Sequence, residues 1–349
     1  MIRIGVVGYG YWGPNLVRNF SDVPGGQVAA VADMSADRRA LAERRHPSIT
    51  TTPDAADLIR DPRIDAIAIA TPVSTHFELA MQALAAGKHV WVEKPLAMNT
   101  SQAARLVDQA DRCGRTLIVD HTFAYTPAVR KIRELIDADA LGRLYYYDSV
   151  RVNLGLFQHD VDVIWDLAVH DLSIIDYVLP ERPCAVSATG MSHLSGKPEN
   201  IAFLTLFFDN HLIAHLHVNW LAPVKVRRTL IGGSRKMIVY DDLEPSEKVK
   251  VYDKGVTING HANNGDVNAN QRYRMLVDYR SGDMFAPQLD ITEALTTEAK
   301  HFISCVEGGR PTLTDGHAGL RVVRILEAAT RSIAARGRIV ELDAMGCAA

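Results

Sequence analysis

The sequence predicts an α/β protein of two domains. Residues 1–121 are expected to form a parallel sheet between helices, and residues 122–349 an α+β domain with a large, open-faced, mainly antiparallel sheet. The length of 349 residues suits two domains of roughly 150 residues each. The first third alternates short apolar strands with helical patterns, whereas the remainder carries long strand-like runs. These three observations carry the prediction.

The first third reads as repeated strand–helix–strand units, which form parallel sheets. In TPVSTHFELAMQALAAGKHV, Thr75 and Glu78 have the spacing of a capping box, and Gly87 follows the apolar positions as a stop signal. The segment therefore predicts a helix with defined ends. The other expected strands cover residues 2–7, 28–32, 64–70, 90–92 and 116–119, and the other expected helices begin at Pro14 or cover 36–45 and 99–112.

The opening segment MIRIGVVGYGYWGPN contains Gly8, Gly10 and Gly13 in the spacing G-x-G-x-x-G, between an expected strand and an expected helix. In that setting Gly8 permits a sharp turn, Gly10 lets the backbone approach a pyrophosphate, and Gly13 lets the helix pack close to the strand. The N–H groups at the helix start attract the phosphates. The motif in this context predicts a dinucleotide site of the Rossmann type.

An acidic residue supports this interpretation and indicates which dinucleotide binds. Asp33 ends the second expected strand, 20 residues after Gly13. A carboxylate there accepts hydrogen bonds from a ribose diol and repels a 2′-phosphate, so NAD is favoured over NADP. Arg38 and Arg39 lie close enough in the sequence to weaken that preference, although they also suit a solvated helix surface.

The C-terminal part has a different rhythm. Long strand-like runs predict an antiparallel sheet, with Asp209-Asn210 as one hairpin turn. Helices are expected around 127–136 and over 162–178, 292–307 and 315–335. Because these helices cover only one face of the sheet, we expect the other face to pair with a second subunit in a dimer or tetramer. Residues 259–274, which include HANNGDVNANQRYR, predict a loop that is either a lid or a plain surface segment.

Composition excludes several classes of protein. The formal net charge is −3 and the basic residues are scattered, which argues against a nucleic-acid surface. No apolar run approaches the ~20 residues of a membrane span, and the first strand leaves no room for a signal peptide, so a cytoplasmic protein is expected. The four cysteines form no C-x-x-C pair and suggest neither a disulfide framework nor a zinc site.

Two short motifs carry candidate chemistry. In VEKPLA, Glu93, Lys94 and Pro95 directly follow a buried strand, where ligands of open α/β sheets bind. Pro95 offers a cis peptide that would aim the Lys94 ammonium, although trans is the commoner form. The alternative is a surface lysine in a loop.

The second motif is WDLAVHDL, where Asp166 and His170 are four residues apart on an expected helix. They would project from one side of the helix, with Asp171 about 100° away. A carboxylate beside an imidazole orients it and raises its pKa, which produces a group able to move a proton near neutral pH. A surface ion pair is the alternative, but the neighbouring residues are mostly apolar, and buried charge calls for a reason.

Other polar residues are weaker candidates. Substrate contacts are expected from residues between a strand and the helix of the second motif: Arg151, Asn153, Gln158, His159 and Asp160. Arg227 and Arg228 are candidates for a phosphate contact, with an ordinary surface role as the alternative. His211, His215 and His217 share a strand but lack an acidic or cysteine partner at ligand spacing, so no metal site is predicted.

Taken together, the residues resemble the glucose-fructose oxidoreductase / inositol dehydrogenase / rhizopine catabolism (Gfo/Idh/MocA) family of NAD(P)-dependent sugar and polyol oxidoreductases. The resemblance lies in GVVGYGYWG, ATPVSTHFELAMQALAAGKHVWVEKPLA, WDLAVHDL and GLRVVRILEAATRSIAARGRIVEL. It implies a Rossmann domain followed by a sheet domain that mediates oligomerisation. It also implies Lys94, Asp166 and His170 as the catalytic group. The cofactor-binding residues implied by it are Gly8, Gly10, Tyr11, Trp12, Gly13, Asp33, Thr71, Pro72, His76 and Glu93.

The resemblance further implies hydride transfer between the nicotinamide and a ring hydroxyl or keto group of a sugar, with His170 moving the proton and Lys94 stabilising the developing alkoxide. The runs VNLGLFQHDVDVIWDL and NWLAPVKVRRTLIGG are most similar to members that act on nucleotide-linked sugars. Two alternatives remain open. One is a dehydrogenase of a free polyol or hexose such as inositol, and the other is a dinucleotide-binding regulator without turnover.

Overall fold

The computed structural model describes residues 1–155, 161–194, 198–258 and 277–342. The chain forms two compact units, and neither is continuous in the sequence. Unit 1 contains residues 1–127, 172–176 and 291–327, and unit 2 contains residues 128–171, 177–290 and 328–349. Helices α7 (Val169–Val178) and α10 (Gly316–Ala334) each contribute residues to both units.

Unit 1 is built on a six-stranded sheet in the order β3-β2-β1-β4-β5-β6, in which all neighbours are parallel. The chain reverses its winding between β1 and β4, which is where ligands of such sheets bind. The strands are β1 (Ile2–Val7), β2 (Gly26–Ala32), β3 (Thr50–Thr52), β4 (Ala66–Ile69), β5 (His89–Glu93) and β6 (Leu117–Asp120). The predicted Rossmann sheet is confirmed.

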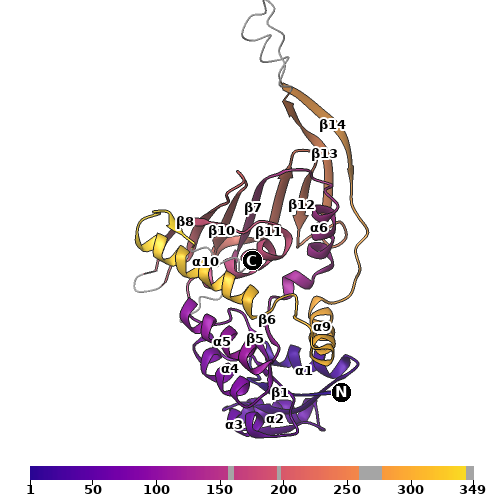
Figure 1. Cartoon of the computed structure of the whole chain (residues 1–349), viewed down its shortest axis with the longest axis vertical. Helices are drawn as coiled ribbons and strands as arrows, with labels where there is room; N and C mark the ends of the chain where they lie inside the picture. Colours follow the sequence, from indigo (N-terminus) through magenta and orange to yellow (C-terminus); the bar gives the residue numbers. More distant parts are fainter. Residues whose placement is uncertain (156–160, 195–197, 259–276, 343–349) are drawn as a thin grey trace, which may run out of the picture. The chain divides into compact units, whose positions relative to one another are not determined.

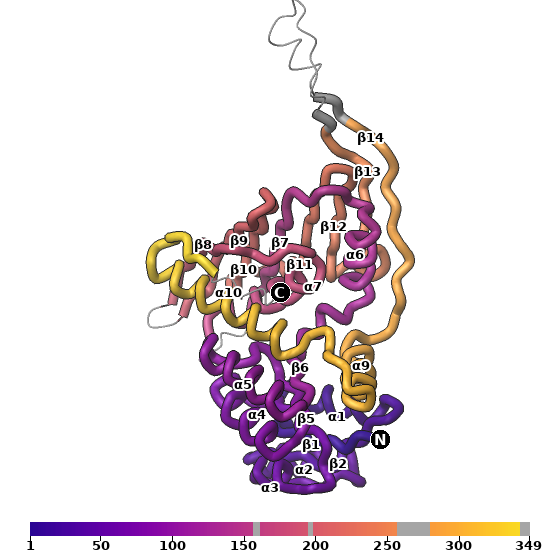
Figure 2. Tube along the Cα trace, in the orientation of Figure 1, coloured from indigo at the N-terminus to yellow at the C-terminus, as the bar shows by residue number. Residues whose placement is uncertain are grey.

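Helices cover both faces of this sheet (Figure 1). Helices α1 (Gly13–Asp22) and α9 (Ala294–Gly308) contact each other on one side, and α4 (His76–Ala85) and α5 (Thr100–Cys113) on the other (Figure 2). Phe20, Trp91 and Phe302 pack edge to face between α1, β5 and α9. The remaining elements are α2 (Ala36–Arg45), α3 (Ala55–Arg60) and the short helices η1 (Val73–Thr75) and η2 (Thr122–Tyr125). Strands buried on both faces explain the continuous apolar runs of the sequence.

Unit 2 contains a nine-stranded sheet in the order β14-β13-β12-β11-β7-β10-β9-β8-β15. All neighbours are antiparallel except β7 and β10. The strands are β7 (Leu144–Leu154), β8 (Ala185–Met191), β9 (Ile201–Phe207), β10 (Ile213–Asn219), β11 (Leu221–Gly233), β12 (Met237–Asp241), β13 (Val249–Ile258), β14 (Val277–Phe285) and β15 (Val340–Glu341). The expected turn at Asp209-Asn210 links β9 to β10.

Burial alternates along the central strands of this sheet. In β9 the side chains of Ala202, Leu204 and Leu206 are buried, whereas Phe203 between them is 42% exposed. Strand β10 follows the same pattern, with Ile213 44% exposed. One face of the sheet therefore carries core residues, and the other displays apolar and histidine side chains. Helix α6 (Pro127–Asp137) and the segment η3 (Ile164–Ala168) complete the elements of this part of the chain.

The segment that contains Asp166 differs from the α-helix expected over 162–178. Residues 164–168 form a π-helical turn, and the regular helix α7 starts only at Val169. In the turn, the N–H of Val169 reaches the carbonyl of Ile164, five residues earlier. A π turn has a longer period than the 3.6 residues that the prediction assumed, and such turns occur often at functional sites.

Candidate active site

The glycine turn of unit 1 leaves room only for glycine at two positions. Gly8 has a φ of +95°, and a Cβ there would lie 2.6 Å from the carbonyl oxygen of Ala70. A Cβ on Gly13 would lie 2.0 Å from the carbonyl oxygen of Gly8, so the start of α1 packs directly on the turn. A Cβ on Gly10 would meet only the flexible guanidinium of Arg38, at 3.3 Å, so this position is open to a ligand. Helix α1 begins here without a side-chain cap, and its N–H groups suit a diphosphate.

Asp33 is held at the end of β2 by backbone donors. Its Oδ2 accepts a hydrogen bond from the Tyr9 N–H at 2.7 Å, and its Oδ1 accepts one from the Ser35 N–H at 2.8 Å. The Arg38 guanidinium lies 3.7 Å from the same carboxylate, and Arg39 donates to the carbonyl oxygens of Asp33 and Met34. Each carboxylate oxygen has a second lone pair for a ribose diol. The glycine turn and Asp33 together fit the adenosine half of NAD.

The end of β4 is joined to the segment after β5 by a buried histidine. The two ring nitrogens of His76 each lie 2.9 Å from a carbonyl oxygen, one of Thr71 and one of Pro95. Burial lowers the pKa of His76. The predicted capping box is wrong, because the Thr75 hydroxyl donates to the Pro72 carbonyl and contacts the Thr71 hydroxyl instead of capping α4.

Lys94 follows β5 directly and is half-buried. The Lys94–Pro95 peptide is cis, contrary to the commoner trans form. Tyr11 and Trp12 complete the predicted cofactor residues, with Tyr11 92% exposed and Trp12 donating its indole N–H to Asp120 at 2.9 Å. The predicted residues of unit 1 thus lie on one edge of one sheet, because the carboxyl ends of parallel strands meet there.

Unit 2 holds the second motif. Asp166 and His170 are both half-buried, and Oδ2 of Asp166 accepts a hydrogen bond from Nε1 of Trp220 at 3.1 Å. Asp171 points elsewhere, as predicted: it is buried and forms an ion pair with Arg151 at 2.7 Å, with Ser149 donating to it at 2.8 Å. Asp166 is therefore held by the indole of Trp220, whereas Asp171 is bound by the guanidinium of Arg151 and the hydroxyl of Ser149.

The remaining substrate candidates have different surroundings. Arg151 is only 4% exposed, and its contact with a substrate stays a prediction beside its ion pair with Asp171. Asn153 is half-buried in β7. Arg227 pairs with Asp242 at 3.2 Å, and Arg228 is exposed. Gln158, His159, Asp160 and the loop 259–274 lie outside the described residues.

The structure brings three carboxyls together, and the sequence had indicated only one of them, Glu93. Glu93 and Asp120 end the adjacent strands β5 and β6 and are register partners. Glu298 of α9 is 0% exposed and interacts with Asp120. Glu298 has a signal in the sequence, because it lies on the buried stripe of α9 between Leu295 and Phe302. A charged residue on an apolar stripe indicates a buried polar contact.

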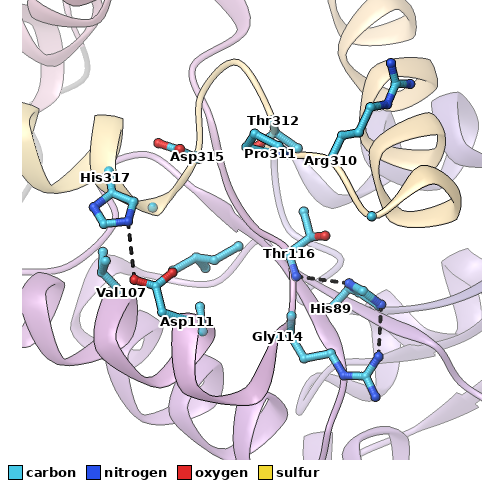
Figure 3. Close-up of a pocket in the computed structure, with 15 residues that line it drawn as sticks. His89, Val107, Asp111, Gly114, Thr116, Arg310, Pro311, Thr312, Asp315 and His317 are labelled. Atoms are coloured by element: carbon cyan, nitrogen blue, oxygen red, sulfur yellow. Dashed lines mark hydrogen bonds and ion pairs between the residues drawn. The ribbon is translucent and has the colours of Figure 1, made fainter.

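A separate cavity of about 360 Å³ lies beside the amino ends of β5 and β6 (Figure 3). In its wall, Nδ1 of His89 accepts from the Thr116 N–H at 3.1 Å, and His317 lies 3.3 Å from Asp111. These ends of the strands are opposite the carboxyl ends that carry the glycine turn. The cavity is therefore not part of the cofactor cradle.

Two further findings concern the described residues as a whole. No three His, Cys, Asp or Glu side chains among them are arranged to hold a metal ion. No helix in the described ranges has the length and apolar character needed to cross a membrane.

Known proteins resemble this chain over most of its length. Residues 2–121 match the model of an oxidoreductase family with an NAD-binding Rossmann fold, and residues 129–239 match the GFO/IDH/MocA C-terminal domain. UDP-N-acetylglucosamine 3-dehydrogenase of Acidithiobacillus ferrooxidans is 28% identical over 332 residues, 92% of this chain and 94% of the relative. Inositol 2-dehydrogenase 2 of Saccharopolyspora erythraea is 30% identical over 240 residues, 66% of this chain and 71% of the relative.

Solved structures agree. A structure of the A. ferrooxidans dehydrogenase superposes with a TM-score of 0.77 at 26% identity, covering 96% of this chain and 98% of the other. Levoglucosan dehydrogenase, in a complex with NADH and levoglucosan, superposes with a TM-score of 0.82 at 20% identity over 98% of this chain and 99% of the other, which shows the shared fold. Both family models, the relative with 30% identity and the cofactor cradle lead to one conclusion: the chain belongs to the Gfo/Idh/MocA family of oxidoreductases and has an NAD-binding Rossmann domain.

Proposed function

We propose that this protein transfers a hydride between NAD and the carbon of a ring hydroxyl or keto group of a sugar, and that the sugar is nucleotide-linked. The observation that carries the proposal is the placement of Asp166 and His170, both half-buried and four residues apart. Asp166 accepts a hydrogen bond from Trp220, whereas Asp171 forms an ion pair with Arg151. The similarity to a UDP-N-acetylglucosamine dehydrogenase over 92% of the chain supports the nucleotide-linked substrate.

Each residue has a distinct part in the proposed reaction. When NAD is bound, its nicotinamide supplies the carbon that accepts the hydride. His170 accepts the proton of the substrate hydroxyl, and the Lys94 ammonium donates a hydrogen bond to the oxygen as negative charge develops there. Asp166 orients the imidazole or binds a neighbouring hydroxyl. In the reverse direction His170 returns the proton and a keto sugar is reduced. Arg151, Asn153, Gln158 and His159 are proposed to contact the sugar.

A free polyol or hexose is the second candidate substrate, because the chain is also similar to an inositol 2-dehydrogenase. The deciding experiment incubates the enzyme and NAD with UDP- and dTDP-sugars, myo-inositol and free hexoses, and follows NADH absorbance. Turnover of free sugars alone would contradict the nucleotide-linked substrate. The regulator without turnover is disfavoured by the retained Lys94, Asp166 and His170.

The catalytic roles are tested by His170→Ala and Lys94→Ala. We expect each variant to lose on the order of 10²–10⁴ in kcat, since general acid–base and charge-stabilising groups contribute amounts of this size. NADH binding, measured by fluorescence, should persist, because neither residue belongs to the glycine turn or contacts Asp33. Unchanged turnover in either variant would remove the proposed role of that residue.

The exposed face of the unit 2 sheet supports a homo-oligomer. Phe203, 42% exposed, stacks on His217 with ring centroids 4.4 Å apart, and Ile213 is 44% exposed on the neighbouring strand. We expect the protein to elute as a dimer or tetramer, and Phe203→Asp to weaken the assembly because it places a charge in an apolar contact. A monomeric wild-type protein in multi-angle light scattering would contradict this.

A cytoplasmic location is also proposed, in keeping with the free thiols of Cys113, Cys184 and Cys305.

A further inference from the structure

The three carboxyls Glu93, Asp120 and Glu298 meet beneath the cofactor edge of unit 1. Glu93 and Asp120 lie on adjacent strands in register, and Glu298 reaches Asp120 from helix α9. Asp120 is 1% exposed and Glu298 is 0% exposed. Like charges that interact in a largely buried group repel strongly, so the three carboxyls do not ionise completely at neutral pH.

The hydrogen bonds identify Asp120 as the acceptor of the group. Its Oδ2 accepts from Nε1 of Trp12 at 2.9 Å, and its Oδ1 accepts from the Thr122 hydroxyl. In the described part of the chain neither oxygen of Glu298 accepts a well-formed hydrogen bond: the nearby N–H of His121 acts on Glu298 but donates to the Val119 carbonyl at 2.7 Å. An ionised Glu298 would be a buried carboxylate facing another carboxylate, whereas a protonated Glu298 supplies the hydrogen that the contact with Asp120 requires.

The surroundings do not offer Glu298 a direct cation. Burial and the charge of Asp120 raise the pKa of Glu298 well above its usual range, and the same causes raise the pKa of Glu93. Burial lowers the pKa of His121 to about 4, so this imidazole is neutral. Among the described residues, the titratable groups that act on the cluster or on its neighbours are Glu93, Lys94, Asp120, His121, Tyr125, Asp176, Glu298 and Cys305. Of these, only Lys94 is a cation, and it acts on Glu93 and His121.

We propose that Glu298 is a positioning residue of the cofactor site: uncharged at neutral pH, it donates a hydrogen bond to Asp120 and thereby fixes the carboxylate that anchors Trp12. Trp12 precedes helix α1 and lies inside the glycine turn, so the position of its indole is coupled to the backbone that receives the diphosphate. The proposal rests on NAD binding and not on which sugar reacts.

The first test compares the melting temperatures of the cofactor-free wild type and Glu298→Gln between pH 5 and 9. Glutamine keeps the volume and a donor but cannot ionise. A glutamate whose folded pKa is raised contributes stability that is fully present below its unfolded pKa, near 4.3, and is lost as pH rises toward the folded value. We therefore expect the wild type to melt lower than Glu298→Gln by about 2–4 °C or more at pH 8, and the gap to shrink toward pH 5.

Glu293→Gln is the matched control, because Glu293 begins the same helix but pairs with Arg18 at 2.7 Å. The hydrogen bond from Arg18 lowers the pKa of Glu293, so its contribution is present above the unfolded pKa and lost as pH falls. The two variants should therefore differ from wild type with opposite pH trends. The proposal would be overturned if the melting temperatures of the wild type and Glu298→Gln differed by the same amount at every pH. It would also be overturned if Glu298→Gln melted below the wild type over the whole pH range.

The second test measures NADH affinity by fluorescence titration. Glu298→Met keeps the side-chain length but removes the donor, and we expect the Kd for NADH to rise about 10-fold or more, in the range of one hydrogen bond to a charged group. Glu298→Gln should bind NADH like the wild type. In a Trp12→Phe background, Glu298→Met should cause little further loss, because the coupled partner is already absent. The proposal would be overturned if Glu298→Met bound NADH with wild-type affinity, or if Glu298→Gln and Glu298→Met weakened NADH binding equally. It would also be overturned if the losses of affinity caused by Trp12→Phe and Glu298→Met were additive. Failure to find a sugar substrate would leave these readings unchanged.

Discussion

Both units of this protein bury charged side chains, but they neutralise them in different ways. In unit 2, Asp171 is met by the guanidinium of Arg151 and the hydroxyl of Ser149. In unit 1, Asp120 accepts hydrogen bonds from Trp12 and Thr122 and faces other carboxyls, and we propose that protonation of Glu298 removes the excess negative charge. A paired site stays neutral over a wide pH range, whereas a site that relies on bound protons changes with pH. The difference predicts that the pH sensitivity of stability resides mainly in unit 1.

The largest effect is expected from breaking the paired site with Arg151→Met. Asp171 is 1% exposed, so its carboxylate would remain buried without its cation. Loss of one partner of a buried pair costs about 3–5 kcal/mol of unfolding free energy. Urea denaturation, followed by a signal from unit 2 such as the environment of Trp220, measures the loss.

Two further variants sharpen that result. The double variant Arg151→Met/Asp171→Leu should recover most of the stability, because apolar replacement of both partners is often neutral or better. Arg63→Gln, which removes an exposed partner of Asp61, should leave the denaturation midpoint unchanged. A stable Arg151→Met single variant would show that Asp171 has another compensating partner. If the double variant is stable but inactive, the proposed contact of Arg151 with substrate gains support.

The sequence was most informative where the pattern of apolar residues follows directly from the burial of an element. In unit 1, the strands that end at Val7, Ala32 and Glu93 were predicted within a few residues, because strands buried on both faces are continuous apolar runs bounded by turns. The glycine turn and Asp33 were found because their chemistry demands residue types at a fixed spacing. The same reasoning predicted that Asp171 diverges from the pair Asp166 and His170.

Contacts between residues distant in the sequence escaped prediction. Glu298 meets Asp120 across 178 positions (298 − 120) and Arg151 meets Asp171 across 20, and no local pattern specifies such partners. The π turn at 164–168 was missed because its apolar positions also fit a regular helix. The capping box at Thr75 failed because a nearer carbonyl and the Thr71 hydroxyl compete for the same side chain.

His121 provides a smaller effect that tests the comparison from the acid side. Burial lowers the pKa of this residue to about 4, from an unfolded value near 6.5. A histidine that is neutral in the folded state contributes stability that is present above the unfolded pKa and lost as pH falls toward the folded pKa. Complete loss across this window amounts to about 3 kcal/mol, since one pKa unit corresponds to ~1.4 kcal/mol.

We therefore expect the stability of the wild type to fall between pH 6.5 and pH 4 more steeply than that of His121→Asn. The slope with pH is the measurement, because the substitution itself changes packing at every pH. Glu298 contributes in the opposite direction over part of this range, so the fall with pH should itself be steepest, and the comparison with His121→Asn most readily measured, in a Glu298→Gln background. If the stability of His121→Asn and of its parent fell with the same slope against pH in that background, the folded protein would accommodate His121 as a cation. Below pH 6.5, the pH dependence of unit 1 would then not differ from that of unit 2 in the way proposed.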